Sequence, residues 1–217
     1  MKVEIWSDVM CRFCYIGKRK FEMALNLFEG KDNVEIVWKS FQLDPTIVSD
    51  ANKTVNQFLA ERKGWTVEYA EQMNDHVTKI AKEVGLEYNL DKAVVANSFD
   101  AHRFSHLAKM HNRQNEAEEQ LFKAYFTDGK NTADHDTIIQ LGVEIGLDAN
   151  EIKQMLKSDA YSEDVRMDIY EAQQIGVSGV PFFLFIDKYT ITGAQDSSVF
   201  LQALNTIKKE IAEAITQ

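Results

Sequence analysis

The chain has 217 residues, with 34 acidic side chains against 24 lysines and arginines and a formal net charge of −10 at pH 7. This acidic balance argues against a nucleic-acid-binding surface, which needs clustered positive charge. A hydrophobic content of 45% and only two prolines are typical of a globular chain, and no apolar run is long enough to span a bilayer. We therefore expect neither a nucleic acid nor a membrane as a partner.

The first 30 residues predict a strand followed by a helix. Residues 2–6 (KVEIW) are a candidate buried strand, and from Tyr15 onward apolar residues recur at helical spacing up to Gly30. The N-terminus lacks the long apolar core and the small-residue cleavage site of a secretory signal, which predicts a cytoplasmic protein. Structural disulfides are rare in that compartment, where CxxC pairs are usually catalytic or metal-binding.

The middle of the chain has a different pattern. Residues 34–43 alternate apolar and polar side chains and predict a second strand, which Pro45 ends. Only helical periods follow, and Gly85 is one of the breaks between them. One helical stripe consists of Tyr69, Met73, Val77, Ile80 and Val84. These stripes predict core packing, not a cofactor site.

Strand character returns near the C-terminus. Residues 180–186 and 189–194 predict the two arms of a hairpin, and a final helix closes the chain. The element order is therefore β-α-β, many helices, then β-β-α. It predicts an α/β sheet protein interrupted by an all-helical insertion. The expected sheet domain consists of residues 1–52 and 161–217, and the expected insertion of residues 53–160.

The only two cysteines, Cys11 and Cys14, stand where the first strand gives way to the helix. Free N–H groups and partial positive charge at a helix N-terminus lower a cysteine pKa from about 8.5 to roughly 3.5–7.5. We predict that Cys11, open to solvent, is the attacking thiolate and that Cys14, one turn further, is the resolving thiol. A metal site and two inert core cysteines are the alternatives. No metal is predicted, because a structural zinc needs four ligands and no second CxxC exists.

Four stretches resemble the DsbA-like branch of the thioredoxin superfamily, particularly its cytosolic FrnE-type oxidoreductases. They are SDVMCRFCYIGKRKF, SFQLDP, NSFDAHRFSHLAK and IGVSGVPFFLFIDKYTITGAQ, in that order along the chain. The resemblance implies a thioredoxin-like fold with a helical insertion, and a thiol:disulfide oxidoreductase acting on disulfides of proteins or small molecules. It implies no cofactor besides the redox-active disulfide, with glutathione or another small thiol as a co-substrate. A homodimer is also expected.

The same resemblance assigns substrate binding to Val180 and Pro181, since the residue before a cis-proline offers its backbone to a substrate in such folds. A trans proline that starts an edge strand is the alternative. The dipeptide Arg12-Phe13 departs from the pattern, because relatives often carry proline directly after the first cysteine. We count Arg12 and Phe13 as candidate substrate-binding residues. Arg12 also places a positive charge beside the thiolate, so we expect the dipeptide either to tune the redox potential of the pair or to be a neutral surface substitution.

Three further residues are candidates for supporting roles. Asp8 either accepts protons near the cysteines or satisfies a turn. His102 and His106 are one helical turn apart, which suits a metal pair, but ordinary positions in the insertion are the simpler interpretation. The resemblance suggests that His102 and Asn97 line a cleft above the cysteines.

The retained CxxC pair favours an oxidoreductase over two other functions. A glutathione-dependent isomerase or transferase of the kappa type shares the fold, but typically has serine at the first cysteine's position. A redox-sensing or chaperone-like binding module would keep the fold with slow turnover. Because redox chemistry needs no insertion, we expect the insertion to form one wall of an apolar cleft beside Cys11 and to select the substrate.

Overall fold

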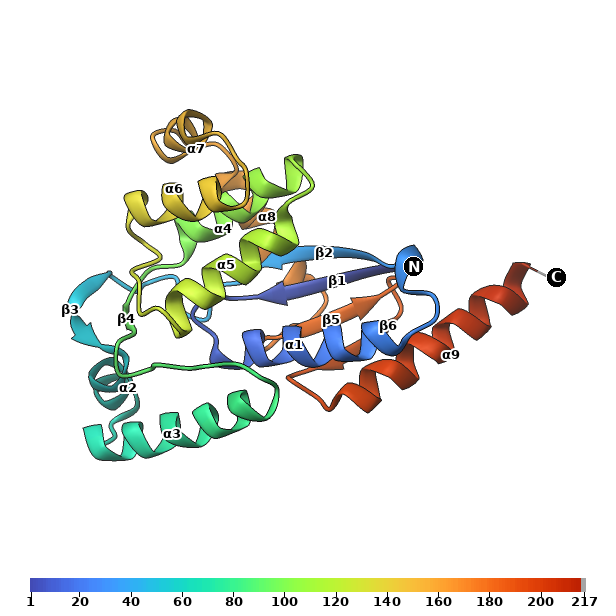
Figure 1. Ribbon diagram of the computed structural model, residues 1–217, viewed down its shortest axis with the longest axis horizontal. Coiled ribbons are helices and arrows are strands. Elements are labelled where there is room, and N and C mark those ends of the chain that lie inside the picture. The colour runs from blue at the N-terminus through green and yellow to red at the C-terminus, as the bar shows by residue number, and fades with distance from the viewer. Residues whose placement is uncertain (216–217) are drawn as a thin grey trace.

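A mixed four-stranded sheet forms the centre of the protein, seen in a computed structural model that describes residues 1–215 (Figure 1). The strands lie in the order β2-β1-β5-β6. β1 is parallel to β2 and antiparallel to β5, and β5 is antiparallel to β6. Their bounds are β1 (Lys2–Ser7), β2 (Glu35–Ser40), β5 (Phe182–Phe185) and β6 (Tyr189–Thr192).

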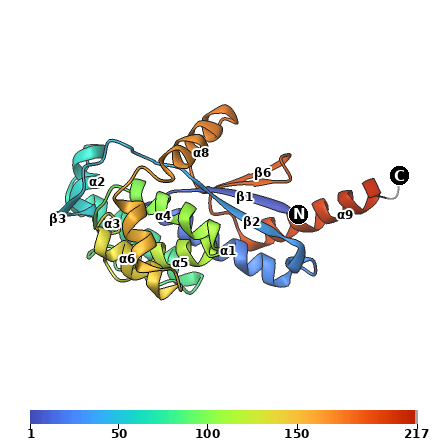
Figure 2. The same cartoon turned by 90° about the horizontal axis from the view of Figure 1, so that it is seen from above.

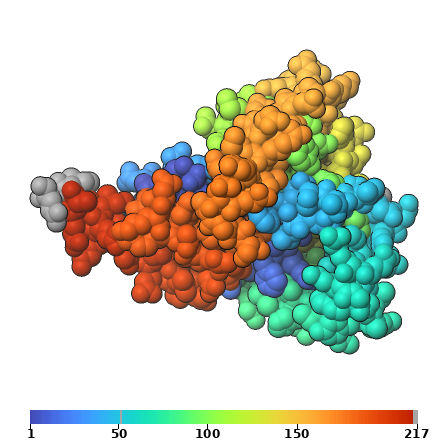
Figure 3. Space-filling view, turned by 180° about the vertical axis from the view of Figure 1, so that it is seen from behind, coloured from blue at the N-terminus to red at the C-terminus, as the bar shows by residue number. Residues whose placement is uncertain are grey.

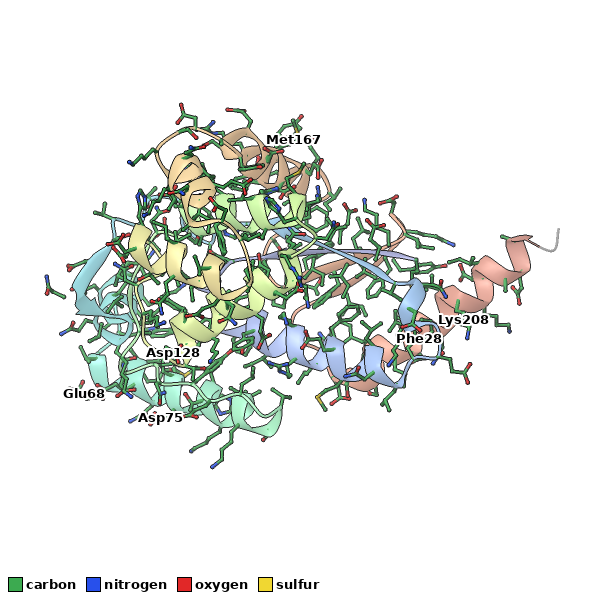
Figure 4. All side chains as sticks on the ribbon, turned by 45° about the horizontal axis from the view of Figure 1, so that its top comes forward. Phe28, Glu68, Asp75, Asp128, Met167 and Lys208 are labelled. Carbon is green, nitrogen blue, oxygen red and sulfur yellow. The ribbon has the colours of Figure 1, made fainter. Side chains whose placement is uncertain are left out.

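Helices cover both faces of this sheet, and Figure 2 shows α1 and α8 on opposite sides of the strands. Helix α1 (Arg12–Leu27) packs beside α9 (Ser197–Ile215) on one face, while α8 (Ser162–Gln174) packs against β2 on the other. The C-terminal end of α1 approaches the middle of α9, where Lys208 Nζ lies 5.6 Å from the ring centroid of Phe28, the residue that caps α1 (Figure 4). The sheet and its helices have the predicted thioredoxin-like order.

Aromatic side chains fill the layer between the sheet and α1–α9. Phe21 of α1, Phe183 of β5 and Phe200 of α9 meet with ring centroids 4.7–5.6 Å apart. On the opposite face Trp6 packs edge-on against Phe182, at 6.0 Å between centroids. Burial of both faces explains why β5, with the sequence FFLF, is a continuous apolar run.

The segment between the two halves of the sheet is mostly helical. In chain order it holds β3 (Asp50–Thr54), α2 (Val55–Lys63), α3 (Val67–Glu83), β4 (Val94–Val95), α4 (Phe99–Met110), α5 (Gln114–Phe126), α6 (His135–Glu144) and α7 (Ala149–Leu156). A short 3₁₀ helix, η1 (Lys31–Asn33), precedes β2. Among the described residues, no helix has both the length and the apolar character needed to cross a membrane.

The expectation that the insertion is all-helical is wrong in one detail. β3 and β4 pair as a small antiparallel sheet, with Asp50 opposite Val95 and Thr54 opposite Val94. The polar sequence DANKT has no strand pattern, so only pairing with a segment about 40 residues later makes it a strand. Thr54 then caps α2, since its side chain accepts a hydrogen bond from the backbone N–H of Gln57.

Candidate active site

The two cysteines lie at the junction between β1 and α1. A turn follows β1, closed by a 2.9 Å hydrogen bond from the N–H of Cys11 to the carbonyl of Asp8. Cys11 is the N-cap residue of α1 and has extended backbone angles. Cys14 lies one turn along, and its N–H donates to the Cys11 carbonyl at 2.8 Å. Both thiols are free.

Neither thiol is open to bulk solvent. Cys11 is 7% exposed and Cys14 is fully buried. The expectation that Cys11 is open to solvent is therefore wrong: its sulfur lies 3.4 Å from the carbonyl oxygen of Val180, and Asn74 and Tyr88 of the insertion contact the next residue, Arg12. Cys11 instead lines a cavity of about 420 Å³, a size suited to a small ligand. Figure 3 shows the hollow in which N-terminal residues (dark blue) appear between α2–α3 and the C-terminal part of the chain.

The two thiols have opposite electrostatic surroundings. The neighbouring Cys14 thiol, helped by the N–H groups of Phe13 and Cys14, lowers the pKa of Cys11. Burial and the charge of Asp8 oppose the shift without reversing it. The pKa of Cys14 is raised well above its ordinary value, first by burial and then by the neighbouring Cys11 thiolate. The pair therefore favours a Cys11 thiolate beside a Cys14 thiol.

A backbone loop approaches Cys11 from the C-terminal half of the chain. The Val180–Pro181 peptide bond is cis, and Cys11 Sγ lies 3.4 Å from the carbonyl oxygen of Val180. The proline ring packs directly on Gly17 of α1, where a Cβ atom would lie only 2.8 Å from Pro181 Cγ. The absence of a side chain at Gly17 thus permits the close approach of this loop to the cysteines.

Asp8 is buried, and its carboxylate accepts hydrogen bonds from backbone N–H groups of the turn before Cys11 and of a neighbouring loop. Its Oδ1 accepts from the N–H of Met10 at 3.2 Å, and its Oδ2 from the N–H of Leu43 at 2.7 Å. His102 Nε2 lies 3.7 Å from Asp8 Oδ1, which is an ion-pair distance but too long for a hydrogen bond. Although burial alone would lower the pKa of His102, the neighbouring Asp8 raises it above its ordinary value, with a further contribution from Glu118.

The expectation that Asn97 and His102 line the cleft is wrong, because neither is among the residues that line the cavity beside Cys11. The Asn97 side chain accepts from the N–H of Phe99 at 2.9 Å and donates to the carbonyl of Ile47 at 2.8 Å. It therefore fixes a loop, while His102 is 2% exposed behind Asp8.

His106 has different partners from His102 and does not form a metal pair with it. Its Nε2 lies 3.1 Å from Ser40 Oγ and 3.0 Å from Asp168 Oδ2, which joins α4 to β2 and α8. Within residues 1–215, no group of three or more candidate metal ligands is found.

The insertion supplies one wall of the cavity, and most of the lining is apolar. Phe58 and Leu59 come from α2, and Tyr125 and Phe126 from the end of α5, while Phe13 comes from the first turn of α1. Because the cavity has an apolar wall next to a thiolate, it can hold a substrate while excluding much of the water around the reacting sulfur.

Sequence reasoning missed two residues that hold the cysteine loop. Tyr88 Oη donates to the backbone carbonyl of Arg12 at 2.6 Å, and Asn74 Oδ1 accepts from Arg12 Nη1. Asn74 is only 3% exposed and lies on the buried face of α3. A signal was present: Ala70, Asn74, Val77 and Ala81 repeat at helical spacing, so an asparagine interrupts the buried stripe.

A family model for the DSBA-like thioredoxin domain matches residues 2–205. The chain belongs to this family. A crystal structure of a probable DsbA oxidoreductase from Streptomyces coelicolor is 37% identical, with a TM-score of 0.91 over 97% of this chain and 91% of that one. The uncharacterised protein YwbO of Bacillus subtilis is 28% identical to this chain. The alignment covers 96% of this chain and 98% of YwbO.

The fold is also shared more widely among DsbA-like proteins. The cytosolic disulfide reductase DsbM from Pseudomonas aeruginosa superposes with a TM-score of 0.65 over 100% of this chain and 99% of that one, at 14% identity. Identity this low shows a common fold alone. Membership of the DsbA-like family supports a thiol–disulfide oxidoreductase role in general terms.

Proposed function

We propose that the protein reduces disulfides of small molecules by cycling Cys11 and Cys14 between dithiol and disulfide. The observation that carries the proposal is the placement of the two thiols: Cys11 caps α1 and lines the cavity, and Cys14 lies buried one turn along the helix. The pKa of Cys11 is lowered and that of Cys14 is raised, which agrees with this placement. The low exposure of Cys11 favours small substrates over folded proteins, because a protein surface does not reach into a cavity of about 420 Å³.

The reaction begins with the Cys11 thiolate, which attacks one sulfur of a disulfide R–S–S–R′. A bond forms between Cys11 Sγ and that sulfur while the S–S bond breaks, and R′S⁻ leaves and takes up a proton. Cys14 then loses its proton and attacks Cys11 Sγ, which releases RS⁻, protonated in turn. The substrate has gained two electrons, and the protein holds a Cys11–Cys14 disulfide. Two equivalents of a low-molecular-weight thiol such as glutathione restore the dithiol and form the oxidised thiol.

The electrostatics of the pair order these two steps. Before attack, the negatively charged Cys11 helps to keep Cys14 protonated. Once Cys11 is bound in a mixed disulfide, this influence disappears and the pKa of Cys14 falls, although burial still opposes ionisation. The resolving thiolate therefore forms when it is needed. The Val180 carbonyl lies 3.4 Å from Cys11 Sγ, which supports a role of this backbone in binding the substrate during the exchange.

The kappa-type alternative gains no support from the site, because a thiol stands at the first position and a second thiol lies beside it. Trapping of the mixed disulfide tests the proposal. Incubation of the Cys14→Ser protein with a small disulfide should leave a stable adduct of one substrate half on Cys11, detected by intact mass. Cys11→Ser should form none. Equal adducts on both variants, or none on either, would refute the assigned roles.

A further inference from the structure

Arg12 is held against the wall of the cavity by the insertion. Its Nη1 donates to Asn74 Oδ1, and Asn74 Nδ2 in turn donates to Asn56 Oδ1. Both asparagines are buried, at 3% and 8% exposure, and Tyr88 Oη fixes the Arg12 backbone from the same side. The guanidinium is thus positioned by neutral amides, next in sequence to the reactive cysteine.

No carboxylate among the described residues pairs with this guanidinium, and the negative charge that acts on it is the Cys11 thiolate, which is lost when Cys11 forms a mixed disulfide. Nη1 is the one group of the Arg12 side chain with a hydrogen-bond partner among residues 1–215. The two carboxylates that line the cavity are engaged elsewhere. Asp44 pairs with Arg62 at 2.6 Å, and Asp8 accepts two backbone N–H groups.

Once Cys11 is bound in a mixed disulfide, the half-buried guanidinium has lost that negative charge, and a substrate carboxylate that neutralises it is stabilised in return. Burial lowers the pKa of Arg12, which indicates that water does not fully solvate the guanidinium. The free Nε and Nη2 donors of a guanidinium form a fork that matches the two oxygens of a carboxylate. The rest of the cavity is lined mainly by apolar groups, which suits a short carbon chain between that carboxylate and a sulfur.

We infer that the Arg12 guanidinium binds a carboxylate of the substrate, so that the preferred substrates are small disulfides with a carboxylate a few bonds from the reacting sulfur. This inference rests on the proposed function and names its substrate class. The chain carries a formal net charge of −10, so overall electrostatics favours cationic substrates over anionic ones. A preference for an anionic disulfide must therefore come from a local site.

Three symmetric disulfides of similar size test the inference in the full-length protein: dithiodipropionate (anionic), hydroxyethyl disulfide (neutral) and cystamine (cationic). The wild type should reduce dithiodipropionate with the lowest KM. Arg12→Gln should raise the KM for dithiodipropionate by about tenfold or more, the loss typical of a charge-assisted hydrogen bond, and should change the KM for the neutral disulfide far less. Arg12→Lys keeps the positive charge and should recover part of the affinity. If Arg12→Gln fails to fold, the three KM values of Arg12→Lys provide the test instead.

The matched control is Arg166→Gln, since this arginine lies on α8 and its side chain is 59% exposed. It should leave all three KM values unchanged. Titration of the thiolate by its ultraviolet absorbance separates substrate binding from an effect on Cys11. If Arg12→Gln weakens all three substrates equally and raises the pKa of Cys11, or if the wild type prefers cystamine, the inference is overturned while the proposed function stands. If the wild type reduces none of the three disulfides, the proposed function itself is refuted.

Discussion

The contact between Gly17 and Pro181 gives a prediction whose size follows from the structure. In Gly17→Ala the new Cβ would lie 2.8 Å from Pro181 Cγ and 3.6 Å from the Ala194 Cα. The Pro181 carbonyl accepts the Gly193 N–H at 2.7 Å, so the ring is not free to turn away. To reach an ordinary contact, the loop has to move by roughly 0.5 Å.

Two energies of opposite sign act in this variant. Alanine gains about 1 kcal/mol over glycine inside a helix, while overpacking of a close contact costs about 1–3 kcal/mol. We therefore expect a net loss of about 0–2 kcal/mol in the free energy of unfolding, measured by urea denaturation. Because the displaced loop carries Val180, the kcat/KM for disulfides should fall more than the rate of Cys11 alkylation by iodoacetamide.

Gly179→Ala is the control for stability, since a Cβ there meets no atom within 4 Å. It should leave the free energy of unfolding nearly unchanged. A Gly17→Ala protein that is more stable than the wild type and keeps full disulfide turnover would show that the Gly17–Pro181 contact does not position the loop, and would refute this reasoning.

Three further predictions concern the charged groups around the cysteines. Cys14→Ala removes the thiol that contributes most to the low pKa of Cys11, so the pH profile of Cys11 alkylation should move to higher pH; an unchanged profile would contradict the assigned cause. Because Asp8 raises the pKa of His102, its stabilising effect is fully present below the unfolded pKa of about 6.5 and is lost as pH rises through the folded value. The loss of unfolding free energy in Asp8→Asn should therefore be larger at pH 5.5 than at pH 8.5, and a difference that grows with pH would be contrary to this sign. Treatment with EDTA should leave disulfide reduction undiminished, whereas loss of activity that zinc restores would revive a metal site.

The order of elements was predictable because it depends on local periodicity. Alternation in residues 34–43 and helical spacing after Tyr15 both reflect which side of an element meets the core. In the first half of α3, the buried face is shifted by one residue from the predicted stripe. Tyr69 is 47% exposed, and the small or polar residues Ala70 and Asn74 face inward instead. Hydrophobicity alone does not distinguish a face that packs closely through alanines from one that presents larger side chains to solvent.

The cysteine pair and its neighbouring proline loop were predictable from motifs, but the burial of Cys11 was not. Its exposure depends on α2 and α5, which the chain reaches only after 40 and 100 further residues. The role of Arg12 was equally hidden, because its partner Asn74 lies 62 residues away in sequence. Local patterns identify such residues, whereas their environment depends on tertiary packing.

A redox titration of the wild type tests whether Cys11 and Cys14 form a reversible disulfide with each other. The protein is equilibrated in mixtures of reduced and oxidised dithiothreitol, quenched with a thiol-blocking reagent and digested for mass spectrometry. We expect a single two-electron transition in which Cys11 and Cys14 lose their reactivity together and an intramolecular disulfide between them appears. If Cys14 stays open to blocking while Cys11 is oxidised, or if oxidation yields disulfides between chains only, the proposed dithiol–disulfide cycle is contradicted.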